Sequence, residues 1–347
     1  MTKEFNSVQE VKVAMKEKLG HIVPEIEIPH KAELIYEINR RKKERGAIIL
    51  GHNYMEPALF WGVPDLVGDS LFLSQQAALT DCDPIIFCGV RFMAETAKIV
   101  NPDKTVLLPA KVAGCSLAES ITASDVRKLR ETYPGIPIVA YINTYADVKA
   151  EVDYCCTSGN AAKIVNSIDS DTIIFLPDEY LAKNVAAETG KKIIVASPQD
   201  HPNLDPDITM IGWTGRCEVH EKFSVSDIDI VRKQYDDVIV IAHPECSPEV
   251  VEASDYSGST SALVDFVKKS SASRFLILTE CSMGDNIIAE NPDKEAIQMC
   301  NVRCPHMNEI TLEDTLHALN ENETLIEVPE ETRVKALRSV ERMLAVS

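Results

Sequence analysis

The segment CNVRCPHMNEI, residues 300–310, holds two cysteines in a C-x3-C spacing that suits a metal site or a disulfide that forms and breaks. Cys304 stands directly before a proline, and Cys300 lies on its amino-terminal side. Free cysteine is also a common small residue of protein cores, so the pair alone leaves a structural interpretation open. The partners of this pair have to come from the rest of the chain.

The composition limits what the chain can bind. Lys and Arg number 35 against 54 Asp and Glu, and the net charge of −19 excludes a broad electrostatic attraction to nucleic acid or to an anionic membrane. An anionic small molecule must therefore be held by local donors. The amino terminus is charged throughout, and no apolar run has the length of a signal-peptide core or a membrane span, so we expect a soluble cytoplasmic protein. Ten cysteines in such a protein favour buried thiols, metal ligands or redox groups over a disulfide framework.

A short pattern recurs three times along the chain. Each copy begins with an apolar run that ends in polar residues: AIILGHNY (47–54), PIVAYINT (137–144) and VIVIAHPE (238–245). An acidic residue follows, and five positions later a small hydroxyl residue opens an amphipathic helical stretch. These pairs are Asp65 with Ser70, Asp153 with Ser158, and Asp255 with Thr260. A second apolar run and a second helical stretch come next, and strands that alternate with helices in this way predict parallel sheets with helices on their faces.

We therefore expect three small α/β domains of similar design. The predicted parts are an amino-terminal helical extension (1–43) and domains over 44–114, 115–216 and 217–304, with helices of residues 305–347 completing the first domain. In parallel sheets, ligands bind beyond the carboxyl ends of the strands. The polar residues at those ends are His52, Tyr54, Tyr141, Asn143, His243 and Glu245.

Hydroxyl residues at the expected helix starts have two compatible interpretations. Ser and Thr are ordinary N-caps, and capping alone would explain them. A helix amino terminus also presents unpaired N–H groups and a partial positive charge, so three such termini could together hold a carboxylate or a phosphate. The residues concerned are Ser70, Ser158, Ser259 and Thr260.

One cysteine near the end of each repeat leads toward a helix: Cys115, Cys217 and Cys304. If the repeats surround a pseudo-threefold axis, three thiolates could meet there and hold a [4Fe-4S] cluster with one iron free of protein ligands. That iron would be a Lewis acid suited to dehydration chemistry. Structural zinc sites instead combine close pairs into four ligands, and the sequence has no second close pair of that kind. A disulfide between Cys300 and Cys304 would remove one ligand from such a cluster.

Nine motifs between residues 30 and 320 belong together: HNY (52–54), GDS (68–70), GVRFMAETAKI (89–99), YINT (141–144), TSGNA (157–161), WTGRCEVH (213–220), HPEC (243–246), GSTS (258–261) and CPHM (304–307). In these motifs the chain resembles the quinolinate synthases, the NadA family. The resemblance implies three pseudo-symmetric three-layer α/β domains around a [4Fe-4S] cluster held by Cys115, Cys217 and Cys304. It also implies that iminosuccinate (iminoaspartate) and dihydroxyacetone phosphate condense to quinolinate, with loss of phosphate and two waters, in de novo NAD biosynthesis.

The same resemblance assigns the site residues. The expected substrate-binding positions are His52, Ser70, Tyr141, Ile142, Asn143, Ser158, His243, Pro244, Glu245 and Thr260, with Tyr54 and Ser259 beside them. For catalysis we expect Glu245 beside His243 to be the general base, and Tyr54 and His52 to move protons or orient substrate. A functional link to an aspartate oxidase or dehydrogenase that produces iminosuccinate is also implied.

Two other functions fit part of the pattern. Three thiolates and an open iron also suit an aconitase-like hydro-lyase that acts on another hydroxy acid. An iron-sulfur redox sensor would need the cysteines alone, whereas the anion-binding helix starts and the polar strand ends favour an enzyme. Nucleotide binding is disfavoured because the sequence has neither a GxxxxGK loop nor a GxGxxG turn after a strand.

Overall fold

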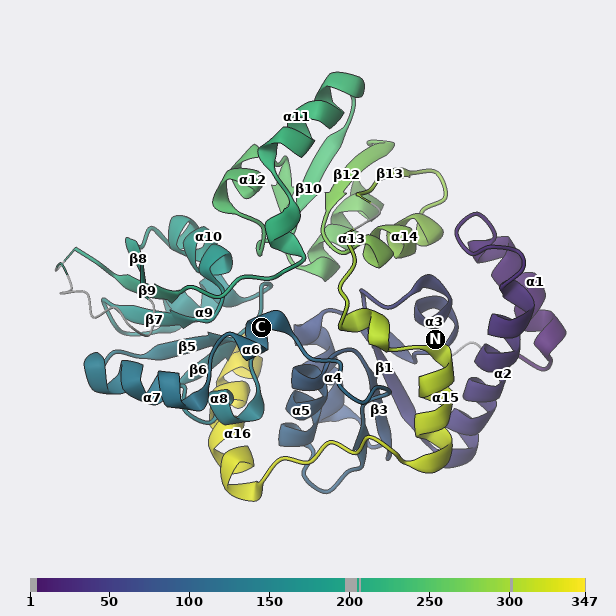
Figure 1. Ribbon diagram of the computed structural model, residues 1–347, viewed down its shortest axis with the longest axis horizontal. Coiled ribbons are helices and arrows are strands. Elements are labelled where there is room, and N and C mark those ends of the chain that lie inside the picture. Colours follow the sequence, from purple (N-terminus) through teal and green to yellow (C-terminus); the bar gives the residue numbers. More distant parts are fainter. Residues whose placement is uncertain (1–4, 197–204, 206, 300–301, 347) are drawn as a thin grey trace.

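The computed structural model describes residues 5–196, 205, 207–299 and 302–346. Three lobes surround a common centre, and each lobe is built on one parallel sheet with flanking helices (Figure 1). This arrangement confirms the predicted fold class of three small α/β units. No helix within the described residues combines the length and the apolar character needed to cross a membrane.

The first lobe carries a four-stranded sheet in which all neighbours are parallel. Its strands, in sheet order, are β2 (Leu66–Gly68), β1 (Ile48–His52), β3 (Ile85–Cys88) and β4 (Val106–Leu107). Its helices are α3 (Pro57–Gly62), α4 (Ser70–Leu79) and α5 (Arg91–Val100). Two amino-terminal helices pack against each other beside this lobe, and they are α1 (Val8–Leu19) and α2 (Ile28–Arg45).

The second lobe carries a five-stranded parallel sheet. Its strands, in sheet order, are β6 (Tyr154–Cys156), β5 (Ile138–Tyr141), β7 (Ile173–Leu176), β9 (Met210–Trp213) and β8 (Ile193–Ala196). Its helices are α6 (Ser116–Glu119), α7 (Ala123–Thr132), α8 (Ala146–Lys149), α9 (Ala161–Ser167) and α10 (Glu179–Thr189).

The third lobe repeats the four-stranded order of the first. Its strands, in sheet order, are β11 (Tyr256–Ser257), β10 (Ile239–Ala242), β12 (Arg274–Leu278) and β13 (Glu295–Ile297). Its helices and 3-10 turns are η1 (His220–Lys222), α11 (Val225–Gln234), α12 (Pro248–Ala253), α13 (Thr260–Lys269), α14 (Cys281–Glu290) and η2 (Met307–Glu309).

The carboxyl-terminal helices join different lobes. Helix α15 (Leu312–Glu321) packs against α2 and β3, whereas α16 (Glu330–Ala345) packs against α8 and β6 of the second lobe and against α5 of the first (Figure 1). The predicted domain boundaries, including the assignment of residues 305–347 to the first domain, remain a prediction.

The acidic residue of each sequence repeat braces the first strand of its sheet. The acidic residue forms two hydrogen bonds with one residue of the strand. Its backbone N–H donates to the carbonyl of that strand residue, and its carboxylate accepts a hydrogen bond from the backbone N–H of the same residue. The pairs are Asp65 with Ile49 (2.8 and 2.8 Å), Asp153 with Ile138 (3.0 and 2.9 Å) and Asp255 with Val240 (2.8 and 2.7 Å). A basic residue forms an ion pair with each carboxylate, namely Lys42, Arg130 and Arg232. These acids therefore serve the fold, and they leave the strand ends available for the site.

Candidate active site

The carboxyl ends of β1, β5 and β10, one from each lobe, face one cavity between the lobes. Most of the residues predicted from sequence line it: His52, Tyr54, Ser70, Cys115, Tyr141, Asn143, Ser158, Cys217, His243, Glu245, Thr260 and Cys304. Ile142, Pro244 and Ser259 do not. His52 and Tyr54 lie at the end of β1, Tyr141 ends β5, and His243 and Glu245 follow β10, so each of the three sheets directs the carboxyl end of one strand at the cavity.

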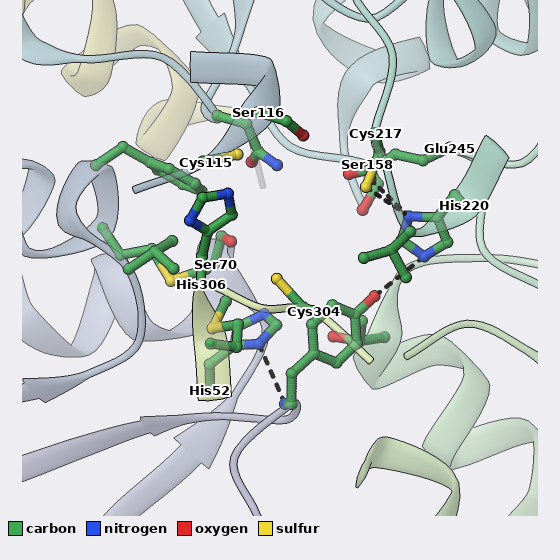
Figure 2. A pocket seen from close by; sticks show the side chains of 18 of the residues that line it. His52, Ser70, Cys115, Ser116, Ser158, Cys217, His220, Glu245, Cys304 and His306 are labelled. Atoms are coloured by element: carbon green, nitrogen blue, oxygen red, sulfur yellow. Dashed lines mark hydrogen bonds and ion pairs between the residues drawn. The ribbon is translucent and has the colours of Figure 1, made fainter. Parts of the chain in front are cut away.

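Each of the three cysteines opens the same kind of turn. Cys115 precedes α6, Cys217 precedes η1 and Cys304 precedes η2. In every case the N–H four residues later donates to the cysteine carbonyl, at 3.0 Å for Cys115, 3.0 Å for Cys217 and 3.1 Å for Cys304. Figure 2 shows the three sulfur atoms pointing into the cavity from different sides. The lobes thus present three equivalent thiols to one space.

Burial sets the protonation of these thiols in the absence of a metal. It raises the pKa of Cys115 and of Cys304 to about 12, and it raises the pKa of Cys217 well above the ordinary value, with the Glu245 charge adding to the effect. Opposing this, the second and third N–H groups after each cysteine bond its sulfur and favour the thiolate. A bound, positively charged metal group would lower the pKa of these thiols and so favour the thiolate, which the N–H groups also stabilise.

None of the three cysteines forms a disulfide with another described residue. Cys300, the other half of the C-x3-C pair, lies outside the described residues. The proposed Cys300–Cys304 disulfide therefore stays a prediction.

Two histidines at equivalent strand ends are fixed in the same tautomer. The backbone N–H of Tyr54 donates to Nδ1 of His52 at 3.2 Å, and the N–H of Glu245 donates to Nδ1 of His243 at 3.3 Å. Burial lowers the pKa of His52 to about 4 and that of His243 to about 3, so both rings are neutral near pH 7. Each ring therefore carries its proton on Nε2, and that of His243 donates to Ser158 Oγ at 3.2 Å.

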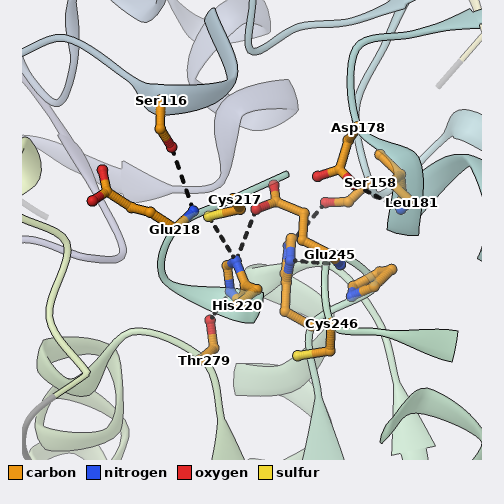
Figure 3. Close-up of polar contacts among 12 residues, drawn as sticks. Ser116, Ser158, Asp178, Leu181, Cys217, Glu218, His220, Glu245, Cys246 and Thr279 are labelled. Carbon is orange, nitrogen blue, oxygen red and sulfur yellow. Dashed lines mark hydrogen bonds and ion pairs between the residues drawn. The ribbon is translucent and has the colours of Figure 1, made fainter. Parts of the chain in front are cut away.

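Glu245 is a fully buried carboxylate inside a hydrogen-bond network (Figure 3). The hydroxyl of Tyr141 donates to one of its oxygens, and Nδ1 of His220 lies 2.8 Å from the other. Burial raises the pKa of Glu245, but the neighbouring His220 and His243 and the Tyr141 hydroxyl outweigh it and hold the pKa below its usual range. Glu245 is therefore ionised, and its contacts with Tyr141 and His220 fix the orientation of its carboxylate.

A second buried carboxyl group, that of Asp178, interacts electrostatically with Glu245. Asp178 caps α10 by accepting the Leu181 N–H at 2.9 Å through one oxygen, and its other oxygen is buried without a partner among the described residues. Burial and the charge of Glu245 raise the pKa of Asp178 well above its usual value. Because the charge on one carboxylate disfavours ionisation of the other, Asp178 with its raised pKa carries the proton and Glu245 carries the charge.

The hydroxyl residues divide between capping and the cavity. Ser259 is the N-cap of α13, and its hydroxyl donates to Asp69 at 3.0 Å, which explains why it is turned away from the cavity. Asp69 rather than Ser70 caps α4. Ser70, Ser158 and Thr260 line the cavity, and so does Asn143, whose buried Oδ1 has no partner in the described structure.

His220 is the main site residue that the sequence predictions omitted. Its Nδ1 lies 3.2 Å from Cys217 Sγ, and its Nε2 lies 2.9 Å from the Thr279 hydroxyl, which in turn bonds Tyr54 at 2.7 Å. The ring also stacks on His243 with 4.7 Å between centroids. The C-x2-H spacing of Cys217 and His220 was the available signal. Asp69, Ser116, Glu218 and His306 also line the cavity and were not predicted.

The described residues that line the cavity include no lysine and no arginine. Its side-chain donors are histidines, hydroxyl groups and an amide, and Asp69, Glu218 and Glu245 supply carboxylates. Any anion bound here must be held by directed hydrogen bonds or by a metal.

Comparisons with known proteins agree over nearly the whole chain. Residues 36–345 match the family described as Quinolinate synthetase A protein, NadA. The chain is 47% identical over 342 residues to Quinolinate synthase 2 of Mesorhizobium japonicum, which covers 99% of this chain and 100% of that protein. It is 50% identical over 321 residues to Quinolinate synthase of Xylella fastidiosa, with coverage of 92% and 88%. It is 46% identical over 333 residues to Quinolinate synthase of Agrobacterium fabrum, with coverage of 96% and 91%.

Proposed function

Because the chain belongs to the quinolinate synthase (NadA) family of NAD biosynthesis, we propose that its central cavity condenses iminosuccinate with dihydroxyacetone phosphate. The products would be quinolinate, phosphate and two waters. The observation that carries this proposal is the meeting of three equivalent cysteines, one ionised carboxylate and two neutral histidines around one cavity.

The donor set fits a [4Fe-4S] cluster held by Cys115, Cys217 and Cys304. Three thiols come from three separate turns, and each sulfur receives two backbone N–H groups that favour the thiolate. The bound cluster would supply a Lewis-acidic iron without a protein ligand. The nearby trio of Cys217, His220 and Glu245, whose ligand atoms lie within 4.8 Å of one another, could also hold a single metal ion. It accounts for only one of the three cysteines, so we favour the cluster.

Substrate carboxylates and phosphate would bind to neutral donors. The Nε2–H groups of His52 and His243, the hydroxyls of Ser70, Ser158 and Thr260, and the amide of Asn143 are the candidates. The two histidines donate reliably because their depressed pKa values and backbone contacts fix both charge and tautomer. For Ile142, Pro244 and Ser259, substrate binding would have to come through backbone groups or a rearranged cavity.

Proton transfer would centre on Glu245. Formation of the carbon–carbon bond requires removal of a proton from carbon, which leaves the electron pair on that carbon. Glu245 is the candidate base because its low pKa keeps the carboxylate ionised, although the same low pKa makes it a weaker base than an ordinary glutamate. Tyr141 and His220 hold the carboxylate in place, and protonated Asp178 keeps a second charge away from it. Tyr54, linked through Thr279 to His220, can pass a proton toward a departing hydroxyl.

Product analysis tests the reaction. The protein, purified without oxygen and given iminosuccinate and dihydroxyacetone phosphate, should form quinolinate and phosphate in equal amounts. An aconitase-like hydro-lyase would instead dehydrate a hydroxy acid and release no phosphate from this mixture. Cluster-loaded protein that forms no quinolinate from these two substrates would contradict the proposal.

Gly215, two residues before Cys217, should be intolerant of a side chain. A Cβ there would lie 2.5 Å from the Pro177 carbonyl oxygen, and the Gly215 carbonyl accepts the Glu179 N–H at 2.7 Å. We expect Gly215→Ala to displace the Cys217 turn, to lower iron and sulfide content per protein, and to cost about 1–3 kcal/mol of stability. Thermal unfolding and iron analysis would measure both effects.

Gly46→Ala is the control for this variant. Gly46 ends α2 with φ of +62°, so alanine is strained there, yet the position has open space and lies outside the cavity lining. It should lower stability by about 1 kcal/mol with unchanged iron content. Full iron content in Gly215→Ala would show that the Cys217 turn does not depend on this glycine.

Two further parts of the function are proposals. The supply of iminosuccinate by an aspartate oxidase or dehydrogenase rests on the chemistry of the substrate, which an amino-acid oxidation produces. A cytoplasmic location rests on membership of the family alone.

A further inference from the structure

Lys149 is a completely buried lysine that the proposed chemistry does not use. It ends α8 and has no exposed surface, and within the described part of the chain no carboxylate forms an ion pair with it. Burial lowers its pKa. A buried lysine without a carboxylate is costly, so its contacts need an explanation.

The side chain of Lys149 bonds both ends of the turn that carries Asn143. Its Nζ donates to the Ile142 carbonyl at 2.9 Å and to the Thr144 carbonyl. The turn itself is unusually tight, because the Thr144 N–H donates to the Ile142 carbonyl at 2.8 Å across a single residue. Lys149 therefore clamps the residues on either side of Asn143 from behind the cavity wall.

A second contact ties Lys149 to the same wall. Its Nζ lies 5.5 Å from the centre of the Phe92 ring, and Phe92 and Asn143 both line the cavity while Lys149 does not. The side-chain oxygen of Asn143 is buried and has no partner among the described residues. The turn thus holds a polar atom ready for a ligand.

We propose that Lys149 is a positioning residue that fixes the Asn143 turn and so aims the Asn143 amide at the substrate. This inference rests on the proposed role of Asn143 in substrate binding. A lysine suits the task because one ammonium group can donate to both carbonyls at once, including the Ile142 carbonyl that also accepts the Thr144 N–H.

Lys149→Met tests the inference, since methionine fills a similar volume and removes the donor. We expect Asn143→Ala to raise KM for one substrate about tenfold, and Lys149→Met to raise KM for the same substrate about five- to tenfold with a smaller change in kcat. In the Asn143→Ala background, Lys149→Met should change KM by less than about twofold, because both substitutions remove the same interaction between Asn143 and the substrate. Iron content should match the parent in all three variants.

Lys42→Met is the matched control. Lys42 is another buried lysine, with Nζ 2.8 Å from the Val63 carbonyl and 2.9 Å from Asp65, but neither it nor these two partners line the cavity. It should lower the melting temperature and leave KM unchanged. A purely structural role for Lys149 predicts the same behaviour for Lys149→Met.

The outcomes separate the inference from the proposed function. If Asn143→Ala leaves KM unchanged for both substrates, the proposed binding role of Asn143 fails, and the inference fails with it. If Asn143→Ala raises KM while Lys149→Met does not, or if the two effects multiply in the double variant, only the inference fails. Should Lys149→Met not fold, Lys149→Gln keeps an N–H donor on a shorter side chain and should show the same dependence on Asn143.

Discussion

Cys304→Ala should fold and yet contain little or no [4Fe-4S] cluster, and it should have no measurable quinolinate synthase activity. Three thiols supply all the protein ligands of the proposed cluster, so losing one removes a third of them. The fold should survive because alanine removes only one sulfur atom from a half-buried position before η2. Iron and sulfide analysis after anaerobic purification, with visible absorption and circular dichroism, would measure cluster and fold separately.

Cys82→Ala is the control for this prediction. Cys82 is exposed and does not line the cavity, so its removal should leave iron content and activity at the parent values. Full cluster content and unchanged activity in Cys304→Ala would rule out the three-thiolate site. The same experiment on Cys115 and Cys217 should give the same loss, because their turns are equivalent.

Glu245→Gln should lower kcat by about 10²–10⁴ while KM changes only a few-fold. Glutamine keeps the size of the side chain and can still bond Tyr141 and His220, but an amide cannot accept the proton that an ionised carboxylate takes. Steady-state kinetics with both substrates, and binding of quinolinate to the variant, would distinguish lost chemistry from lost binding.

Glu249→Gln is the matched control, because Glu249 is an exposed residue of the same type in the first turn of α12, four residues after Glu245. Its kcat should equal that of the parent. Parent-like kcat in Glu245→Gln would remove Glu245 from the mechanism. A large rise in KM with unchanged kcat would instead make Glu245 a binding residue.

The repeated pattern in the sequence was sufficient to predict the fold class. Apolar runs such as IIFC and IIFL are buried along their whole length, as expected for parallel strands covered on both faces. The same regularity brought His52 and His243 to one cavity, because equivalent strand ends converge. The packing of α16 on the second lobe had no local signal, since contacts between residues far apart in sequence depend on the assembled shape.

The site was harder to predict where a residue has two possible tasks. Ser259 and Thr260 are neighbours of similar chemistry, but one hydroxyl caps α13 and bonds Asp69 while the other lines the cavity. Local sequence cannot separate these uses, because both need a hydroxyl at a helix start. His220 was omitted for a different reason. It lies in a single 3-10 turn, whereas the predicted site residues lie at strand ends, at helix starts or at cysteines.

The absence of lysine and arginine from the described cavity wall has a consequence for product release. A fixed positive charge attracts any anion, and this attraction falls off slowly with distance. A hydrogen bond weakens steeply when its distance or angle departs from the ideal. Two flexible substrates can arrange their carboxylates and phosphate to meet such donors. The planar pyridine ring of quinolinate fixes its carboxylates at one separation, and the phosphate has left, so fewer donors can be matched at once. We therefore expect aromatisation also to weaken the binding of the product in the proposed site, which would favour release and turnover.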